Sequence, residues 1–165
     1  MKKIILSFML LLPLSMVAQE VKIGTVKMND ITAVMPEVAT LENTLMALNQ
    51  TYQAELQSME NDYNRKYSEF VSQQDSLADN IKTLRIQDIQ DLQSRMENLA
   101  QAAQQDIEKK QAELFAPIQD KIMKAIEQVG DENGFTCVMH ATYMLYAGKT
   151  CEDITDKVKA KLGLK

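Results

Sequence analysis

The chain has 165 residues and a formal net charge of −5, with 45% apolar, 25% charged and only 5% aromatic residues. This composition is ordinary for a single folded domain, but the few aromatic residues and the absence of tryptophan favour an elongated helical body over a thick globular core. The acidic balance argues against binding to nucleic acid or to anionic lipid through charge, since both partners require a basic face.

Residues 1–18 have the pattern of a signal peptide. Two lysines form a basic start, residues 4–17 are uncharged and apolar, and Ala18 offers a small residue for cleavage. The apolar run has 14 residues, which is short for a membrane span because a spanning helix needs about 20. An uncleaved anchor is the alternative. We expect an exported periplasmic protein of a bacterial envelope, with no stable insertion into the membrane.

The mature chain is expected to open with a strand and a turn before a long helix. Residues 21–28 (VKIGTVKM) are rich in β-branched side chains, and Asn29 and Asp30 follow them as turn residues. Pro36 fits the first turn of a helix, where its missing N–H is not needed, and Glu37 places negative charge near the helix N-terminus. A long helix is therefore predicted to begin near Pro36.

Residues 37–116 contain neither proline nor glycine, and their apolar residues recur at spacings of three and four, as on one stripe of a helix. The polar stretch SQQDSLAD at 72–79 divides this stripe in two, and Ser76 with Asp79 resembles the capping pair of a new helix. The first series is Val38, Leu41, Leu45, Leu48, Tyr52, Leu56, Met59, Tyr63, Tyr67 and Phe70, and the second is Ile81, Leu84, Ile89, Leu92, Met96, Leu99, Ala103, Ile107 and Leu114.

Two arrangements fit these series: one continuous rod, or an antiparallel hairpin that turns near residues 74–76. A turn at residue 75 would place Val38 opposite Ala112 and give legs of nearly equal length, so the hairpin is favoured. Each leg of roughly 37 residues would then be about 55 Å long.

Pro117 is the only proline in the rest of the chain. It either kinks a helix that continues or starts a new helix after a break, and both readings place a joint there, at the root of the arm. Beyond this helix, residues 135–139 (FTCVM) and 143–147 (YMLYA) are predicted as strands, and a terminal helix is predicted to open at 150–153. The expected fold class is mainly α with a small β body, in which a long antiparallel helical hairpin is inserted into a small α+β domain.

Cys137 and Cys151 are the only cysteines. A disulfide between them would close a loop of about 15 residues and stabilise an exported protein by about 3 kcal/mol; the alternative is that Cys137 is a small buried apolar residue. Two cysteines at this spacing with one histidine, His140, do not form a convincing metal site. His140 lies in a predicted hairpin turn without a nucleophile motif, and the five glycines are scattered. Neither an enzyme nor a cofactor is expected.

Four segments carry a resemblance to a known family. They are IGTV at 23–26, MPEV at 35–38, QQDIEKKQAELFAPIQDKIMKAIEQVGDENGF at 104–135 and DITDKVKAKL at 153–162. Together they make essentially the whole mature chain similar to the Skp/OmpH family of periplasmic chaperones.

The resemblance implies a homotrimer. Residues 19–36 and 117–165 would form a trimerisation body, and residues 37–116 would form arms around a cavity. There the protein would act as an ATP-independent holdase for unfolded outer-membrane β-barrel proteins. The alternative is a non-enzymatic coiled-coil spacer or adaptor of the envelope that grips one folded partner.

Six arm residues are candidates for contact with unfolded chains, because flexible methionine and aromatic side chains make weak, adaptable contacts. They are Met46, which lies beside the main stripe, and Met59, Tyr63, Tyr67, Phe70 and Met96, for which packing between the two legs is the alternative.

The arm is acidic. Removal of residues 1–18 with their two lysines leaves 16 basic and 23 acidic residues, a net charge of −7, and residues 37–116 carry all of it with 14 acidic and 7 basic residues. Well-studied members of the family have strongly basic arms. The difference argues against capture of acidic clients by charge and against a lipopolysaccharide site built from basic residues.

Overall fold

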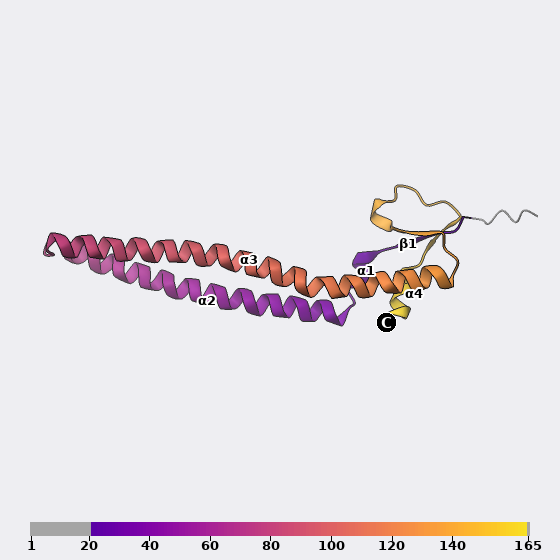
Figure 1. Ribbon diagram of the computed structural model, residues 1–165, viewed down its shortest axis with the longest axis horizontal. Helices are drawn as coiled ribbons and strands as arrows, with labels where there is room; N and C mark the ends of the chain where they lie inside the picture. Colours follow the sequence, from indigo (N-terminus) through magenta and orange to yellow (C-terminus); the bar gives the residue numbers. More distant parts are fainter. Residues whose placement is uncertain (1–20, 165) are drawn as a thin grey trace, which may run out of the picture.

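The computed structural model describes residues 21–164, so the predicted signal peptide at 1–18 lies outside the described part of the chain. Figure 1 shows a long, thin helical hairpin with a small body at one end, and the body is made from segments that precede and follow the hairpin. No helix within residues 21–164 combines the length and the apolar character needed to cross a membrane. The expected fold class, mainly α with a small β body and a long hairpin, is confirmed.

The hairpin consists of α2 (Pro36–Gln73) and α3 (Asp79–Glu132). With 38 residues, α2 is about 57 Å long. As predicted, Pro36 is the first helical residue and the chain reverses, which excludes the single rod. The predicted capping pair is wrong, because the Ser76 hydroxyl donates instead to the carbonyl of Gln73 (2.8 Å) and α3 begins without a side-chain cap.

The pairing of the two legs differs from the prediction. Lys66 lies 3.5 Å from Asp88 across the legs, and Glu37 forms an ion pair with Lys121. Glu37 therefore lies opposite the turn of α3 that follows Pro117. The prediction from sequence paired its neighbour Val38 with Ala112, which lies further from the body. The reversal between Gln73 and Asp79 comes later than residue 75, and every cross-leg pair shifts with it.

Pro117 lies inside α3, so the reading of a new helix start is wrong and the helix continues through the proline. Proline has no backbone N–H and its ring crowds the carbonyl four residues earlier, here that of Glu113, so the helical ladder is interrupted. Figure 1 shows the ribbon of α3 changing direction close to the start of α2. Beyond that point α3 leaves α2 and enters the body.

The body contains a three-stranded sheet with the order β2-β1-β3, formed by β1 (Ile23–Val26), β2 (Cys137–His140) and β3 (Cys151–Asp153). Both outer strands run parallel to β1, and Ile23 is paired with Cys137 on one side and Cys151 on the other.

The second strand predicted at 143–147 is wrong. Residues Ala141–Tyr143 form a short 3₁₀ helix, and the chain then runs without regular structure to β3, where the terminal helix had been expected. A parallel strand requires a crossover connection, so residues 141–150 carry the chain past β1 instead of forming a hairpin. His140 accordingly ends a strand and does not lie in a hairpin turn.

The core of the body lies between one face of the sheet and three helices: α1 (Met28–Thr32), the end of α3 and α4 (Thr155–Lys161). Its fully buried large side chains are Ile31, Ile122, Ile154 and Val158. Gly24 in β1 is required by packing, because an added Cβ would lie 3.1 Å from a methyl group of Val138 and 3.3 Å from one of Ile154.

Asp153 links the end of β3 to α4 and to β1. Its carboxylate accepts hydrogen bonds from the Thr155 hydroxyl (2.5 Å) and the Thr155 N–H (3.0 Å), and it lies 2.9 Å from the Lys27 ammonium. These donors, led by the Thr155 hydroxyl, lower the pKa of Asp153 to about 2, while the pKa of Lys27 is raised by the same carboxylate. The residues that follow β1 and β3 are thereby fixed relative to each other.

Candidate binding surfaces of the arm

Two of the six candidate residues are open to solvent. Met46 is 58% exposed and Tyr67 is 52% exposed. The other four, Met59, Tyr63, Phe70 and Met96, are half-buried, as expected for residues that also pack between the legs.

The six candidates do not form one compact pocket. On α2 they extend from Met46 to Phe70, a distance of about 36 Å along a helix. The structure brings one pair together: the rings of Tyr63 and Tyr67 are stacked with centroids 6.1 Å apart and an angle of 7° between their planes. The arrangement suits many separate weak contacts along the arm better than one deep site.

The distal end of the arm exposes apolar residues that the sequence interpretation missed. Ile81 and Leu84 were assigned to the buried stripe, yet they are 38% and 59% exposed, and Val71 and Ile86 are also exposed. With Tyr67, these four form a group that we call the tip residues: Tyr67, Val71, Ile81, Leu84 and Ile86. Each helix of a two-helix arm has only one neighbour, so apolar side chains off the shared stripe remain in water.

Along the middle of the arm, small residues leave a groove between the legs. The Tyr52 and Leu56 side chains face a part of α3 that contains Ala100 and Ala103, and the groove there has a volume of about 370 Å³. The Tyr52 hydroxyl donates a hydrogen bond to Asp106 (2.9 Å), and this bond raises the pKa of Tyr52. The hydrogen bond fixes the register of the legs at this level.

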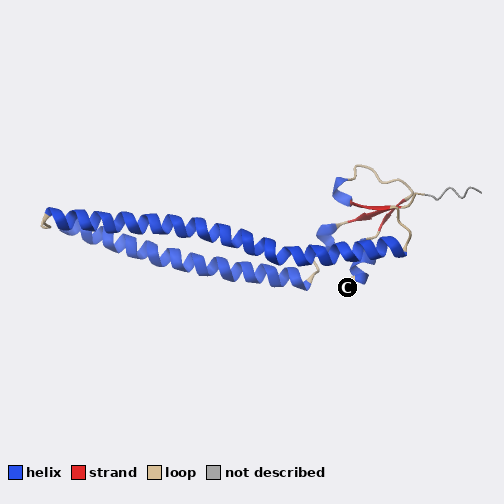
Figure 2. Ribbon diagram, viewed as in Figure 1, coloured by secondary structure: helices blue, strands red, loops and turns tan. Residues whose placement is uncertain are grey.

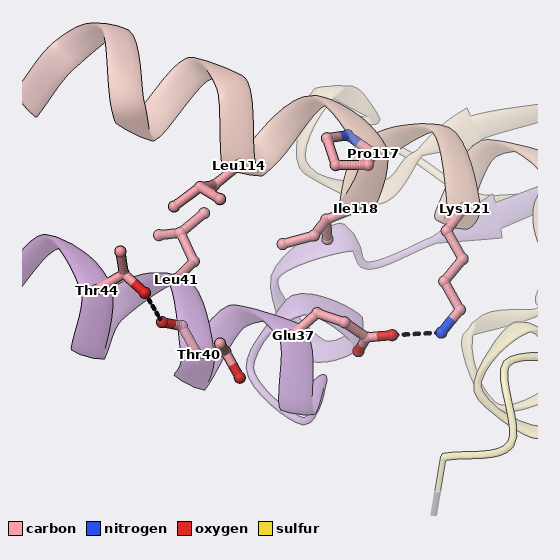
Figure 3. A pocket seen from close by; sticks show the side chains of 8 residues that line it. All are labelled: Glu37, Thr40, Leu41, Thr44, Leu114, Pro117, Ile118 and Lys121. Atoms are coloured by element: carbon pink, nitrogen blue, oxygen red, sulfur yellow. Dashed lines mark hydrogen bonds and ion pairs between the residues drawn. The ribbon is translucent and has the colours of Figure 1, made fainter.

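A second hollow lies at the arm root, beside Pro117 (Figure 3). Its volume is about 380 Å³. Its Thr40 and Thr44 hydroxyls donate to carbonyls of their own helix at 3.0 and 2.8 Å, so the remaining surface is largely apolar. At its rim the Lys121 ammonium donates to Glu37 and lowers the pKa of that carboxyl. The lining residues are Glu37, Thr40, Leu41, Thr44, Leu114, Pro117, Ile118 and Lys121.

This hollow can accommodate an apolar side chain from another polypeptide. The sequence interpretation did not find it, because its two walls come from distant segments whose alignment depends on the cross-leg pairing. Pro117 was singled out as a joint, but not as part of a cavity wall.

The structure contains no disulfide between Cys137 and Cys151 within one chain, and Cys137 is exposed rather than buried. Cys137 and Cys151 are free, and they occupy the two outer strands at the same level, on either side of Ile23. Two strand spacings separate them by about 9.6 Å, whereas bonded cysteines have Cα atoms at most about 7 Å apart. In the part of the chain from 21 to 164, no group of three or more His, Cys, Asp or Glu side chains is placed to hold a metal ion.

Comparisons with known proteins agree with this architecture. A family model described as outer membrane protein (OmpH-like) matches residues 22–162. The structure is also similar to the crystal structure of a candidate outer membrane chaperone (OmpH-like) from Caulobacter crescentus CB15, with a TM-score of 0.73 and 16% sequence identity over 87% of this chain and 83% of that chain. At this identity, the likeness shows a common fold. No curated protein matches the sequence significantly. Because the family model spans nearly all of the described residues, the chain belongs to the OmpH-like family of outer membrane proteins.

Proposed function

We propose that this protein is an ATP-independent holdase chaperone of the periplasm. In this proposal it is a homotrimer without enzymatic activity, and it binds unfolded outer-membrane β-barrel proteins between its arms and prevents their aggregation. Family membership, the similarity to a candidate outer membrane chaperone and the signal-peptide pattern of residues 1–18 support the proposal.

The observation that carries the proposal is the exposure of large apolar side chains along the arm. Met46 lies near its base and Leu84 near its tip, and they are 58% and 59% exposed. An isolated exposed apolar residue needs no explanation, but a series along a thin arm offers repeated contacts to an unfolded chain. Many weak contacts displayed on three arms would act together through high effective concentration.

In this mechanism the cargo is released without nucleotide. The arm contacts are individually weak, so a client leaves when its own folding gives its apolar surface a better environment. Pro117 is the proposed joint at which each arm opens, since the interrupted ladder there leaves α3 easier to bend. Residues 19–36 and 117–165 are the proposed trimerisation body.

The function is tested by measuring the native mass of the mature protein and then its effect on β-barrel aggregation. We expect a trimer that keeps several unrelated unfolded outer-membrane proteins soluble at about one trimer per client. Aggregation is followed by light scattering after the unfolded outer-membrane protein is diluted from denaturant in the presence of the trimer. An envelope spacer would protect none of them and would co-purify with one folded partner, and that result would reject the proposal.

The two most exposed candidates provide a residue-level prediction. Replacement of both Met46 and Tyr67 with serine should weaken client binding about tenfold, which corresponds to about 1.4 kcal/mol, because both side chains offer apolar surface that a client can cover. Their exposure of more than half implies little change in the stability of the arm. Fluorescence titration with a labelled unfolded barrel measures the affinity.

The matched control replaces two exposed polar residues of the same helix, Asn43 and Asn64, with serine. This variant should bind clients as the wild type does. Equal affinity in both double variants would show that Met46 and Tyr67 are not part of the binding surface.

A further inference from the structure

The turn between α3 and β2 contains the only asparagine of the chain that is followed by glycine, Asn133 with Gly134. Figure 2 shows the loop in which α3 ends and the chain turns back to the sheet. Gly134 has a φ of 66°, a conformation that favours glycine at the end of a helix, and an added Cβ there would meet open space. The glycine that ends the helix therefore leaves its own backbone nitrogen unshielded by a side chain.

An asparagine before glycine can lose its amide without an enzyme. The backbone nitrogen of Gly134 attacks the side-chain carbonyl carbon (Cγ) of Asn133 and loses its proton, and the new N–C bond closes a five-membered succinimide ring as ammonia leaves. Water then opens the ring at either carbonyl and gives aspartate or isoaspartate. The chain gains water and loses ammonia, so the reaction needs no oxidant and no cofactor. Gly134 is exposed, so water reaches the ring.

In the folded body, the amide of Asn133 is held at both ends. Its Nδ2 donates to the carbonyl of Val129 at 2.7 Å, and its Oδ1 accepts from the Lys157 ammonium at 3.1 Å. A carbonyl can only accept and an ammonium can only donate, so these two partners fix one orientation of the amide. Lys157 belongs to α4, so the amide is held in this way only while α4 is packed against the end of α3.

The backbone of the turn also keeps the reacting atoms apart. Asn133 has a ψ of 5°, so the nitrogen of Gly134 is aligned with the backbone nitrogen of Asn133. The Cβ of Asn133 is about a third of a turn away around the Cα–C bond. The Gly134 N–H also donates to the carbonyl of Asp131 at 3.3 Å. Ring closure requires the attacking nitrogen next to Cγ, so the backbone must rotate and these hydrogen bonds must break first.

We propose that Asn133 is a site of covalent modification, at which the amide is converted to aspartate or isoaspartate when the body opens. The folded body holds the reaction back through Lys157, Val129 and the backbone of the turn. Aspartate would place a carboxylate against the Val129 carbonyl at the negative end of α3, and isoaspartate would lengthen the backbone just before β2. The modification therefore records an earlier opening of the body and weakens its closure.

The first test follows the mature wild-type protein at neutral pH, in buffer and in guanidinium chloride that unfolds it. Peptide mass spectrometry measures the fraction of Asn133 that is converted with time. We expect conversion to be slower in the folded protein by about tenfold or more, because the hydrogen bonds of the turn must open before the ring can close. Equal rates in the two solutions, or no conversion in guanidinium chloride, would overturn the proposal.

The second test removes the contact from α4. K157M should convert Asn133 about threefold faster than the wild type in buffer, and at the wild-type rate in guanidinium chloride, because the reacting pair itself is unchanged. The matched control is K124M, at an exposed position earlier in α3, and it should react as the wild type does. The rates are compared at a temperature at which circular dichroism shows all three proteins folded. A wild-type rate for K157M in buffer would overturn the proposed hold on the amide.

The third test measures the consequence of the modification. N133D carries the side chain of one product, and amide hydrogen exchange at 122–132 should be faster in this variant than in the wild type. N98D adds the same charge at an exposed position in the arm and should leave exchange at 122–132 unchanged. Equal exchange in the two variants would contradict the proposed weakening of the body. These measurements concern the body of each chain, so their outcome is independent of client binding.

Discussion

Replacement of Ile122 with alanine is expected to destabilise the body by about 2 to 5 kcal/mol. Ile122 is fully buried where the end of α3 packs on the sheet and on α4, so the truncation removes apolar contacts and leaves a cavity. A small domain is stable by only about 5–15 kcal/mol, so the loss is a large fraction of the total. The body also holds the ends of both legs, and its unfolding would release the arms.

The effect of this change is measured by urea unfolding followed by circular dichroism, at several protein concentrations because assembly contributes to apparent stability. The matched control is Met123→Ala, which alters the next residue of the same helix at a position that is 45% exposed. The control should shift the unfolding midpoint little. Equal shifts for the two variants would contradict the placement of Ile122 in the core.

Replacement of Leu92 with aspartate is expected to open the arm locally and leave the body folded. Leu92 is 6% exposed between the legs, close to Ile89 at 8%. Placing a carboxylate in this thin apolar contact costs about 3 kcal/mol or more. Because each leg packs against only one partner helix, the arm can respond by separating its legs there without disturbing distant contacts.

Hydrogen exchange with mass spectrometry distinguishes local from global opening. Amides in the arm segments around 52–70 and 84–107 should lose protection in L92D, while those of the last turns of α3, at 122–132, keep theirs. Gln93→Asp adds the same charge at the adjacent exposed position and should leave both regions protected. Loss of protection in the body would show that arm and body unfold as one unit.

The long elements of the fold could be predicted from the sequence because their signals are local. Apolar spacing of three and four marked both legs, and Pro36 marked the start of α2. Strand β3 could not be predicted in the same way. Its three residues, Cys151–Asp153, include two carboxylates and become a strand only through pairing with β1, which lies far away in the sequence.

The candidate surface was predicted less completely, for a related reason. Met46 was recognised because it lies off the apolar stripe, and the structure leaves it exposed. Leu84 fits the stripe by spacing, yet it is exposed, because burial depends on what the opposite leg presents at that level. Sequence spacing shows which residues share a helix face, but the register of the pairing decides which of them are covered.

The position of the arm within the chain also constrains how the molecule can fold. β1 precedes the arm and both of its partner strands follow it, so the sheet joins segments separated by the entire hairpin. Pairing these strands first would require closure of a very long flexible loop, with a correspondingly large entropic penalty. When α2 and α3 are paired along the arm, the contact between Glu37 and Lys121 brings the segments before and after the hairpin close together. The loop that must then be closed to pair β1 with β2 and β3 is much shorter. We therefore expect the arm to allow a sheet between distant segments to form through nearly local steps.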